Sequence, residues 1–169
     1  LITMVKEGRR VMADPANYEA RANIMWTGMV AQNGLTGVGR AADWGTHHLE
    51  NELSSAYGCS HGAGLAILFP AWMEYAMKTQ DITRFVEFAT RVWGCQMNFE
   101  APEVTAREGI VAFKNFMKEI GMPTSITEIG GKEADIPALA KSMFHEAPNH
   151  GSFVKLTEEM ARDIYRLAL

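Results

Sequence analysis

Hydrophobic residues recur at the 3.6-residue spacing of α-helices along most of the chain. The clearest example near the N-terminus is a stripe at i, i+4, i+7 and i+11 that consists of Tyr18, Ala22, Met25 and Met29. We expect its helix to begin at Asp14-Pro15, because Asp is a common cap and Pro is favoured at the first helical position. It should end at Asn33-Gly34. We interpret the methionine-rich face as ordinary core packing.

The same spacing, bounded by capping and helix-breaking residues, predicts further helices. They cover residues 1–13, about 43–57, from after 61 to about 79, 81–94, 102–120, about 135–146, and from 157 to the end. Gly58 is placed to end one of them, Pro70 to kink the next, and Thr157 to cap the last. Glycine-containing loops are expected over 35–42 and 124–132. No stretch alternates convincingly at period two. The sequence therefore predicts an all-α helical bundle, with residues 1–169 as a single domain.

Composition and charge exclude several classes of protein. The chain has 169 residues, 47% of them hydrophobic, and a net charge of −4, with no basic stripe of the kind that nucleic-acid binding needs. The most apolar run, residues 62–76, is too short to span a membrane and contains Pro70 and Glu74. Cys59 and Cys95 lie far apart, which favours free, at least partly buried thiols in a reducing compartment. We therefore expect a cytoplasmic protein with no nucleic-acid or membrane partner.

The N-terminal residues do not resemble a targeting signal. Lys6, Arg9 and Arg10 follow the apolar residues, whereas a signal sequence places its charges first. The chain also begins in the middle of a helical pattern and without an initiator Met. We expect it to be a fragment of a longer protein.

Three of the five histidines lie in one central stretch: His47, His48 and His61. His47 and His61 are separated by one expected helix and a turn, so two imidazoles from different elements can meet there. His47 and His48 are adjacent on a helix and should point about 100° apart, which disfavours a shared metal. Gly62 and Gly64 permit close approach of a backbone to a ligand. The competing interpretation is that these are helix-end histidines bonded to backbone or water.

Other residues near this stretch have two interpretations each. Asp43 precedes His47 by four positions, a spacing that can seat a metal, but it also suits a helix cap. His145 and His150 flank Pro148, and we interpret both as surface loop residues. Three apolar residues are candidates for a surface near the site or for the core: Trp44, Leu49 and Leu65.

The residues in this stretch resemble a known metal-binding signature. Residues 43–47 (Asp-Trp-Gly-Thr-His), 60–67 (Ser-His-Gly-Ala-Gly-Leu-Ala-Ile) and 69–72 (Phe-Pro-Ala-Trp) resemble that of the iron-containing (group III) alcohol dehydrogenases, in particular the butanol dehydrogenase-like subgroup. Residues 14–26 and 164–168 resemble the segments that precede this signature and end the family's chain. The resemblance covers almost the whole chain.

The resemblance implies a two-domain enzyme that interconverts primary alcohols and aldehydes by metal-assisted hydride transfer. An N-terminal α/β domain, absent from this chain, would bind NAD(P)H, and residues 1–169 would be the helical metal and substrate domain. The family's metal ligands are an Asp and three His, and the last two correspond to His47 and His61. Fe²⁺ is the metal that the family implies, with Zn²⁺ as the alternative, and a homo-oligomer is expected.

The departures from the family set limits on this chain. The first two ligands form an Asp-x3-His pair that precedes the segment where the chain starts, so we expect the chain alone to be inactive. Asn51 stands where many relatives have a His near the substrate, and we assign no catalytic residue. Two alternatives remain open. One is an independent metal-dependent hydrolase that uses His47, Asp43, Glu52 and His61, and the other is a non-catalytic helical interaction domain.

Overall fold

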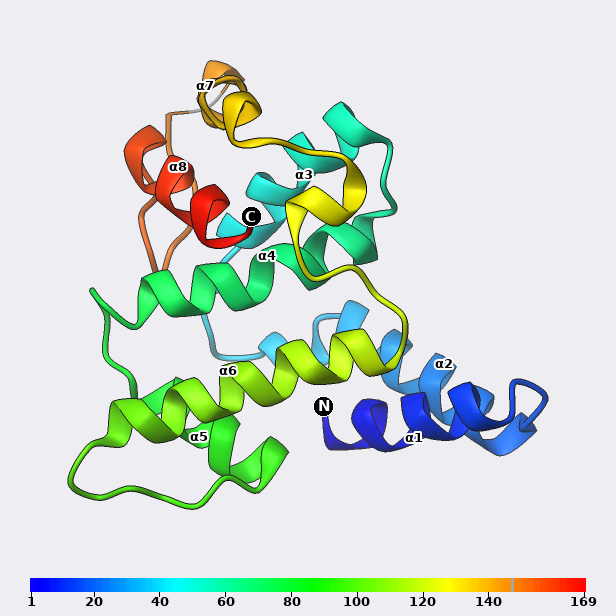
Figure 1. Ribbon diagram of the computed structural model, residues 1–169. Coiled ribbons are helices and arrows are strands. Elements are labelled where there is room, and N and C mark those ends of the chain that lie inside the picture. Colours follow the sequence, from blue (N-terminus) through cyan, green and yellow to red (C-terminus); the bar gives the residue numbers. More distant parts are fainter. Residues whose placement is uncertain (147) are drawn as a thin grey trace. The chain divides into compact units, whose positions relative to one another are not determined.

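The computed structural model describes residues 1–146 and 148–169, and helices dominate this part of the chain (Figure 1). Its α-helices are α1 (Ile2–Ala13), α2 (Tyr18–Gln32), α3 (Gly45–Tyr57), α4 (His61–Ala76), α5 (Thr83–Trp93), α6 (Pro102–Glu119), α7 (Ile136–Glu146) and α8 (Glu158–Leu167). Short 3₁₀ helices are η1 (Leu35–Gly37), η2 (Ile126–Ile129) and η3 (Glu133–Asp135). The described residues contain no β-strand, only an isolated bridge between His150 and Leu156. The expected all-α fold is confirmed.

Residue contacts divide the chain into two compact units, residues 1–42 and 43–169. The smaller unit holds α1, α2 and η1, and the larger holds α3 to α8. The expectation that residues 1–169 form one domain therefore stays a prediction. Within the described chain, no helix combines the length and the apolar character needed to cross a bilayer.

The start of α2 differs from the sequence prediction. Asn17 caps the helix, because its side-chain oxygen accepts a hydrogen bond from the Ala20 N–H at 3.0 Å. Asp14 instead ends α1, and its Oδ1 accepts from the Ala16 N–H at 3.1 Å. The Asp14 carboxylate thus closes a turn between the two helices. The predicted start at Asp14-Pro15 was wrong, whereas the predicted end at Asn33-Gly34 is confirmed.

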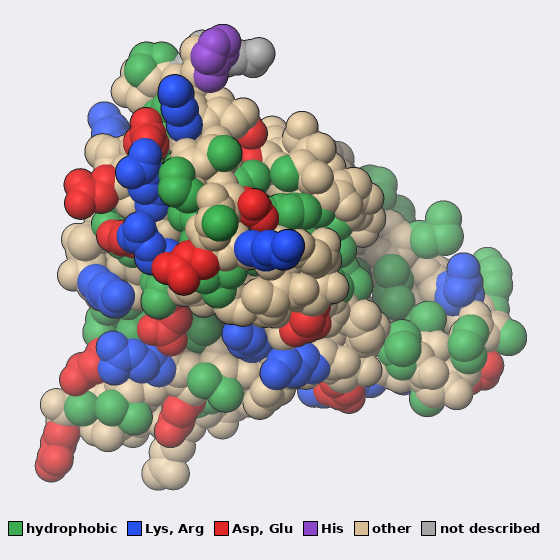
Figure 2. Space-filling model, turned by 45° about the horizontal axis from the view of Figure 1, so that its top comes forward, with side chains coloured by type: hydrophobic (Ala, Val, Ile, Leu, Met, Phe, Trp, Pro, Cys, Tyr) green, Lys and Arg blue, Asp and Glu red, His purple; other side chains and the backbone are tan. Residues whose placement is uncertain are grey.

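The methionine-rich stripe of α2 is exposed, so its assignment to the core was wrong. Tyr18 is 82% exposed, Met25 76% and Met29 43%. These side chains are largely exposed, and hydrophobic side chains are visible on the surface of the smaller unit in Figure 2. Apolar residues lie on more than one side of α2, since Trp26 falls outside the stripe. Periodicity therefore could not identify the buried side of this helix.

In the larger unit, α4 is the helix around which the core is built. It contacts α3, α6 and α8, and eight of its residues are buried. Figure 1 shows α3 and α8 near it, with the α5–α6 pair on its other side. The helix continues through Pro70 to Ala76, a little short of the expected end near residue 79. A helix that is apolar on most of its surface is expected to be buried.

The predicted helix ends in the larger unit are largely confirmed. Gly58 ends α3 and Gly94 ends α5, each with a positive φ (65° and 72°) that glycine adopts without strain. The Thr157 side chain caps α8 by accepting from the Met160 N–H. Cys59 and Cys95 are free and partly buried, as expected.

A hydrogen bond joins the end of α3 to the segment before α7 and gives a pH-dependent prediction. The Tyr57 hydroxyl donates to Asp135 Oδ2 at 2.9 Å. The pKa of Tyr57 is raised to about 12, mainly by burial and next by this hydrogen bond. The raised pKa means that the stabilisation is complete below the unfolded-state pKa of about 10 and is lost as the pH rises through 12.

We expect an absorbance titration at 295 nm to contain a tyrosinate step near pH 12 that Tyr57→Phe removes. Urea unfolding midpoints should fall as the pH rises from about 10 to 12 in the wild type, with a smaller fall in Tyr57→Phe. Unchanged steps in the variant would contradict this assignment.

Candidate functional site

The first turns of α3 and α4 bring His47 and His61 together. His47 is the third residue of α3 and His61 the first residue of α4, and the turn at Gly58 reverses the chain between them. The centroids of the two imidazole rings lie 5.3 Å apart. The expectation that these histidines from different elements can meet is consistent with this geometry.

Packing fixes the ring of His47 and leaves one of its nitrogens without a partner. Trp44 contacts the ring edge-on at 4.7 Å between centroids, and Phe69 does so at 6.3 Å. Nδ1 is buried and has no hydrogen-bond partner among the described residues. The pKa of His47 is lowered, mainly by burial and next by the neighbouring His61. The neutral form that this favours has a lone pair to offer, which is the form that binds metals.

His61 is held by a carboxylate that the sequence analysis missed. Glu50, fully buried on α3, contacts the Nδ1 of His61 and accepts a hydrogen bond from the hydroxyl of Ser54. The lack of a side chain at Gly64 makes room for it, because a Cβ there would lie 2.6 Å from Glu50 Cγ. The signal was present in the sequence. Glu50 falls in the buried stripe of α3 between Leu49 and Leu53, where a carboxylate is unexpected.

These residues fit part of a transition-metal site. Imidazole is the commonest transition-metal ligand, and a buried carboxylate behind one of the rings is a usual feature of such sites. In the part of the chain that the structure describes, no group of three or more His, Cys, Asp and Glu side chains is placed to hold a metal ion. By themselves, His47 and His61 could supply two ligands to a metal.

Asp43 is engaged with the backbone. Its Oδ1 accepts from the Gly45 N–H at 2.7 Å, at the start of α3. Its Oδ2 accepts from three consecutive backbone N–H groups of the loop before α8: Ser152 at 3.0 Å, Phe153 at 2.6 Å and Val154 at 3.3 Å. The residue in the cap position is Trp44, not Asp43. Asp43 nevertheless accepts a hydrogen bond from the first N–H of the helix, as a capping residue would. These contacts favour a structural role over a metal-ligating one.

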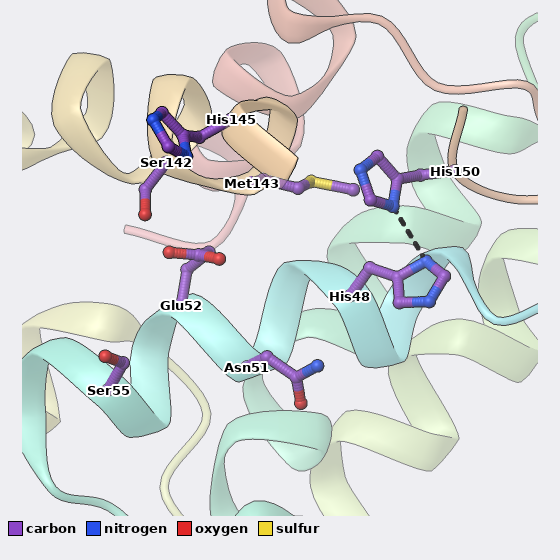
Figure 3. Close-up of a pocket in the computed structure, with 8 residues that line it drawn as sticks. All are labelled: His48, Asn51, Glu52, Ser55, Ser142, Met143, His145 and His150. Carbon is purple, nitrogen blue, oxygen red and sulfur yellow. Dashed lines mark hydrogen bonds between the residues drawn. The ribbon is translucent and has the colours of Figure 1, made fainter. Parts of the chain in front are cut away.

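A second pair of histidines lies on the neighbouring side of α3 (Figure 3). The His48 side chain points toward His150, which lies in the loop before α8, and their Nδ1 atoms are 3.0 Å apart. The pKa of His48 is lowered, mainly by burial and next by His150. His150 is 8% exposed, so its assignment to the surface was wrong. Its ring packs against Phe144, a contact across the fold that local sequence does not reveal.

This pair lies at one end of a polar cleft of about 560 Å³ between α3 and α7. The other residues that line the cleft are Asn51, Glu52, Ser55, Ser142, Met143 and His145. Figure 3 shows Glu52 facing Ser142, away from the His48–His150 contact. His145 is exposed, as expected, but it belongs to α7. Among the apolar candidates, Leu49 is core, Leu65 is partly buried, and Trp44 is 53% exposed beside His47.

The chain matches the model of the "Fe-containing alcohol dehydrogenase family, C-terminal" over residues 1–169. It is 35% identical over 167 residues to NADH-dependent butanol dehydrogenase A of Clostridium acetobutylicum, covering 98% of this chain and 43% of that protein. It is 34% identical over 169 residues to NADPH-dependent aldehyde reductase YqhD of Escherichia coli, covering 99% and 43%. The chain thus spans less than half the length of these relatives.

Solved structures of similar proteins have the same fold. The crystal structure of NADH-dependent butanol dehydrogenase A from Thermotoga maritima matches with a TM-score of 0.91 at 35% identity, over 98% of this chain and 43% of that one. A structure of YqhD from E. coli matches with a TM-score of 0.92 at 32% identity, over 99% and 43%. The fold of this chain is therefore that of the corresponding part of these proteins.

Proposed function

Because the chain belongs to the Fe-containing alcohol dehydrogenase family, we propose that it is the metal-binding C-terminal part of an NAD(P)-dependent enzyme that interconverts primary alcohols and aldehydes. The observation that supports this most directly is the pairing of His47 with His61, with ring centroids 5.3 Å apart and Glu50 behind one ring. A bound divalent metal, Fe²⁺ by family and Zn²⁺ as the alternative, would supply Lewis acidity to the alcohol or carbonyl oxygen.

The residues of this chain contribute binding and orientation to that chemistry. His47 and His61 would each offer one neutral nitrogen to the metal, and the lowered pKa of His47 keeps it in the neutral form. Trp44 and Phe69 fix the ring of His47 and exclude water from one side of it. Asn51 cannot take up or release a proton near neutral pH, so a proton relay at this position would have to use another group.

The other parts of the proposal concern the whole protein. Two further metal ligands and the nicotinamide site would lie in residues that precede this chain in a protein of its relatives' length. We propose a cytoplasmic homo-oligomer in which that part and this one together form the active site. This chain alone is expected to show no NAD(P)H oxidation with butanal.

A metal titration tests the proposed site. We expect this chain to bind Zn²⁺ or Co²⁺ weakly, because two imidazoles leave the ion mostly ligated by water. His47→Ala and His61→Ala should each abolish the binding, as followed by isothermal titration calorimetry. His48→Ala is the matched control, since it removes the neighbouring imidazole of the same helix. Binding that survives both ligand variants, or that His48→Ala weakens equally, would contradict the proposal.

The alternative of an independent hydrolase has less support. It requires Asp43 and Glu52 to join His47 and His61 around one metal. Asp43 is instead bonded to four backbone N–H groups, and Glu52 faces the cleft between α3 and α7. Phosphatase or esterase assays of this chain with added Zn²⁺, Mn²⁺ and Fe²⁺ should therefore show no activity.

A further inference from the structure

Glu50 is a buried carboxylate in an otherwise uncharged stripe of α3. It is 0% exposed, and the other buried residues of this helix are Gly45, Thr46, Leu49 and Leu53. Burying a carboxylate in such surroundings is costly unless it is paired and hydrogen-bonded. Glu50 meets this condition through one oxygen on the His61 Nδ1 and the other on the Ser54 hydroxyl. These contacts offset the cost of burying the carboxylate.

The space for this carboxylate is built into the facing helix. A Cβ at Gly64 of α4 would lie 2.6 Å from Glu50 Cγ and 2.9 Å from its Cδ, closer than real contacts allow. A larger residue at position 64 would therefore force the Glu50 side chain to move from the place where it contacts His61. Gly64 and Glu50 form a matched pair across the α3–α4 contact.

The contact with Glu50 determines what the other nitrogen of His61 can do. An imidazole that donates its Nδ1–H to a carboxylate carries no proton on Nε2 when it is neutral, so Nε2 offers a lone pair. Carboxylates that bond ligand histidines in this way fix both the tautomer and the orientation of the ring. His61 needs such a restraint because its side chain is 53% exposed.

We infer that Glu50 is a positioning residue, which holds His61 in the Nδ1–H tautomer with Nε2 presented to the metal. The inference rests on the proposed function, because it takes His61 as a metal ligand. His47 and His61 are thus prepared differently: aromatic packing orients His47, and a buried carboxylate orients His61. Glu50 itself does not touch the metal or the substrate in this role.

The tautomer of His61 can be read directly in the metal-free chain. A long-range ¹H–¹⁵N correlation spectrum at pH 8 should show a single tautomer, with the proton on Nδ1. Glu50→Gln should give a mixture of tautomers, because the amide can donate to Nδ1 as well as accept from it. Glu52→Gln is the matched control on the same helix and should leave the spectrum of His61 unchanged. A wild-type His61 with its proton on Nε2 overturns the inference, whether or not any variant folds.

Zn²⁺ titrations then separate this inference from the proposed function. Glu50→Gln should weaken binding about 10- to 100-fold, and Glu52→Gln should have no effect. If His61→Ala leaves Zn²⁺ binding intact, the proposed metal site fails. If His61→Ala abolishes binding but Glu50→Gln changes neither affinity nor tautomer, only the role of Glu50 is overturned.

A second variant covers the case in which Glu50→Gln does not fold, as judged by circular dichroism. Gly64→Ala leaves the charge of Glu50 intact but forces the carboxylate away from His61. We expect the same loss of the single tautomer and the same weakening of Zn²⁺ binding. A folded Gly64→Ala chain with wild-type tautomer and affinity would count against the inference.

Discussion

Replacing Tyr165 by Ala is expected to lower the free energy of unfolding by about 3–5 kcal/mol, the range for truncating a large buried aromatic side chain. Tyr165, on α8, is fully buried in the core, and its hydroxyl donates to the Leu49 carbonyl of α3 at 2.8 Å. The substitution leaves a cavity and also removes the hydrogen bond to the Leu49 carbonyl. Burial also raises the pKa of Tyr165 well above its usual value, so the hydroxyl stays protonated and continues to donate.

Denaturant unfolding of the two variants Tyr165→Ala and Tyr165→Phe separates the cavity from the hydrogen bond. Tyr165→Phe keeps the ring and should cost about 1 kcal/mol, the usual size of a hydrogen bond in such comparisons. Equal losses in the two variants would show that ring packing contributes little to the core.

Local sequence predicts the helices of the larger unit well because their ends are encoded locally. Gly58 and Gly94 end helices in the left-handed conformation, and the Thr157 side chain caps α8, all within a few residues of where the signal lies. The predicted start of α2 was wrong because the local sequence offers two possible caps there. Two residues, Asp14 and Asn17, can each cap a helix, and only the turn between α1 and α2 selects Asn17.

Which side of a helix is buried depends on the rest of the fold. The stripe of α2 has helical periodicity, yet Met25 and Trp26 are both exposed. In α3 the periodicity is informative, and it places Glu50 in the buried stripe with Leu49 and Leu53. Local sequence does not show what pairs with this carboxylate, because its partner His61 lies on the next helix. A charged residue in register with core positions is a useful signal for a paired, buried group.

That His47 and His61 can meet could be expected from the sequence because a single helix and turn separate them, whereas their role as metal ligands was expected from the family resemblance. The partner of His48 could not be expected in this way, because His150 follows about a hundred residues later and the two meet only once α7 and α8 have packed. The same holds for Asp43, whose loop partners at 152–154 are equally distant in sequence. Contacts of this kind follow from the tertiary structure and carry no local pattern.

Replacing Asp43 by Ala is expected to lower the free energy of unfolding by about 3 kcal/mol. The carboxylate accepts from Gly45 at the start of α3 and from three consecutive N–H groups at 152–154, and hydrogen bonds to a charged group contribute about 1.5–3 kcal/mol each without adding fully. The loop before α8 should also become mobile, which hydrogen exchange at these amides can measure. Wild-type protection of the three amides in the variant would contradict the anchoring role.

Asp43→Asn decides between the structural role of Asp43 and its apparent metal-ligand spacing with His47. The amide keeps one accepting oxygen, so the loss of stability should be smaller than in Asp43→Ala, and protection at 152–154 should be partly retained. If Asp43 anchors the loop and is not a ligand, Zn²⁺ should bind folded Asp43→Asn as it binds the wild type. A loss of affinity as large as that of His47→Ala would instead make Asp43 a third ligand. The metal would then have to draw the carboxylate away from the loop, and protection at 152–154 would fall when Zn²⁺ binds to the wild type.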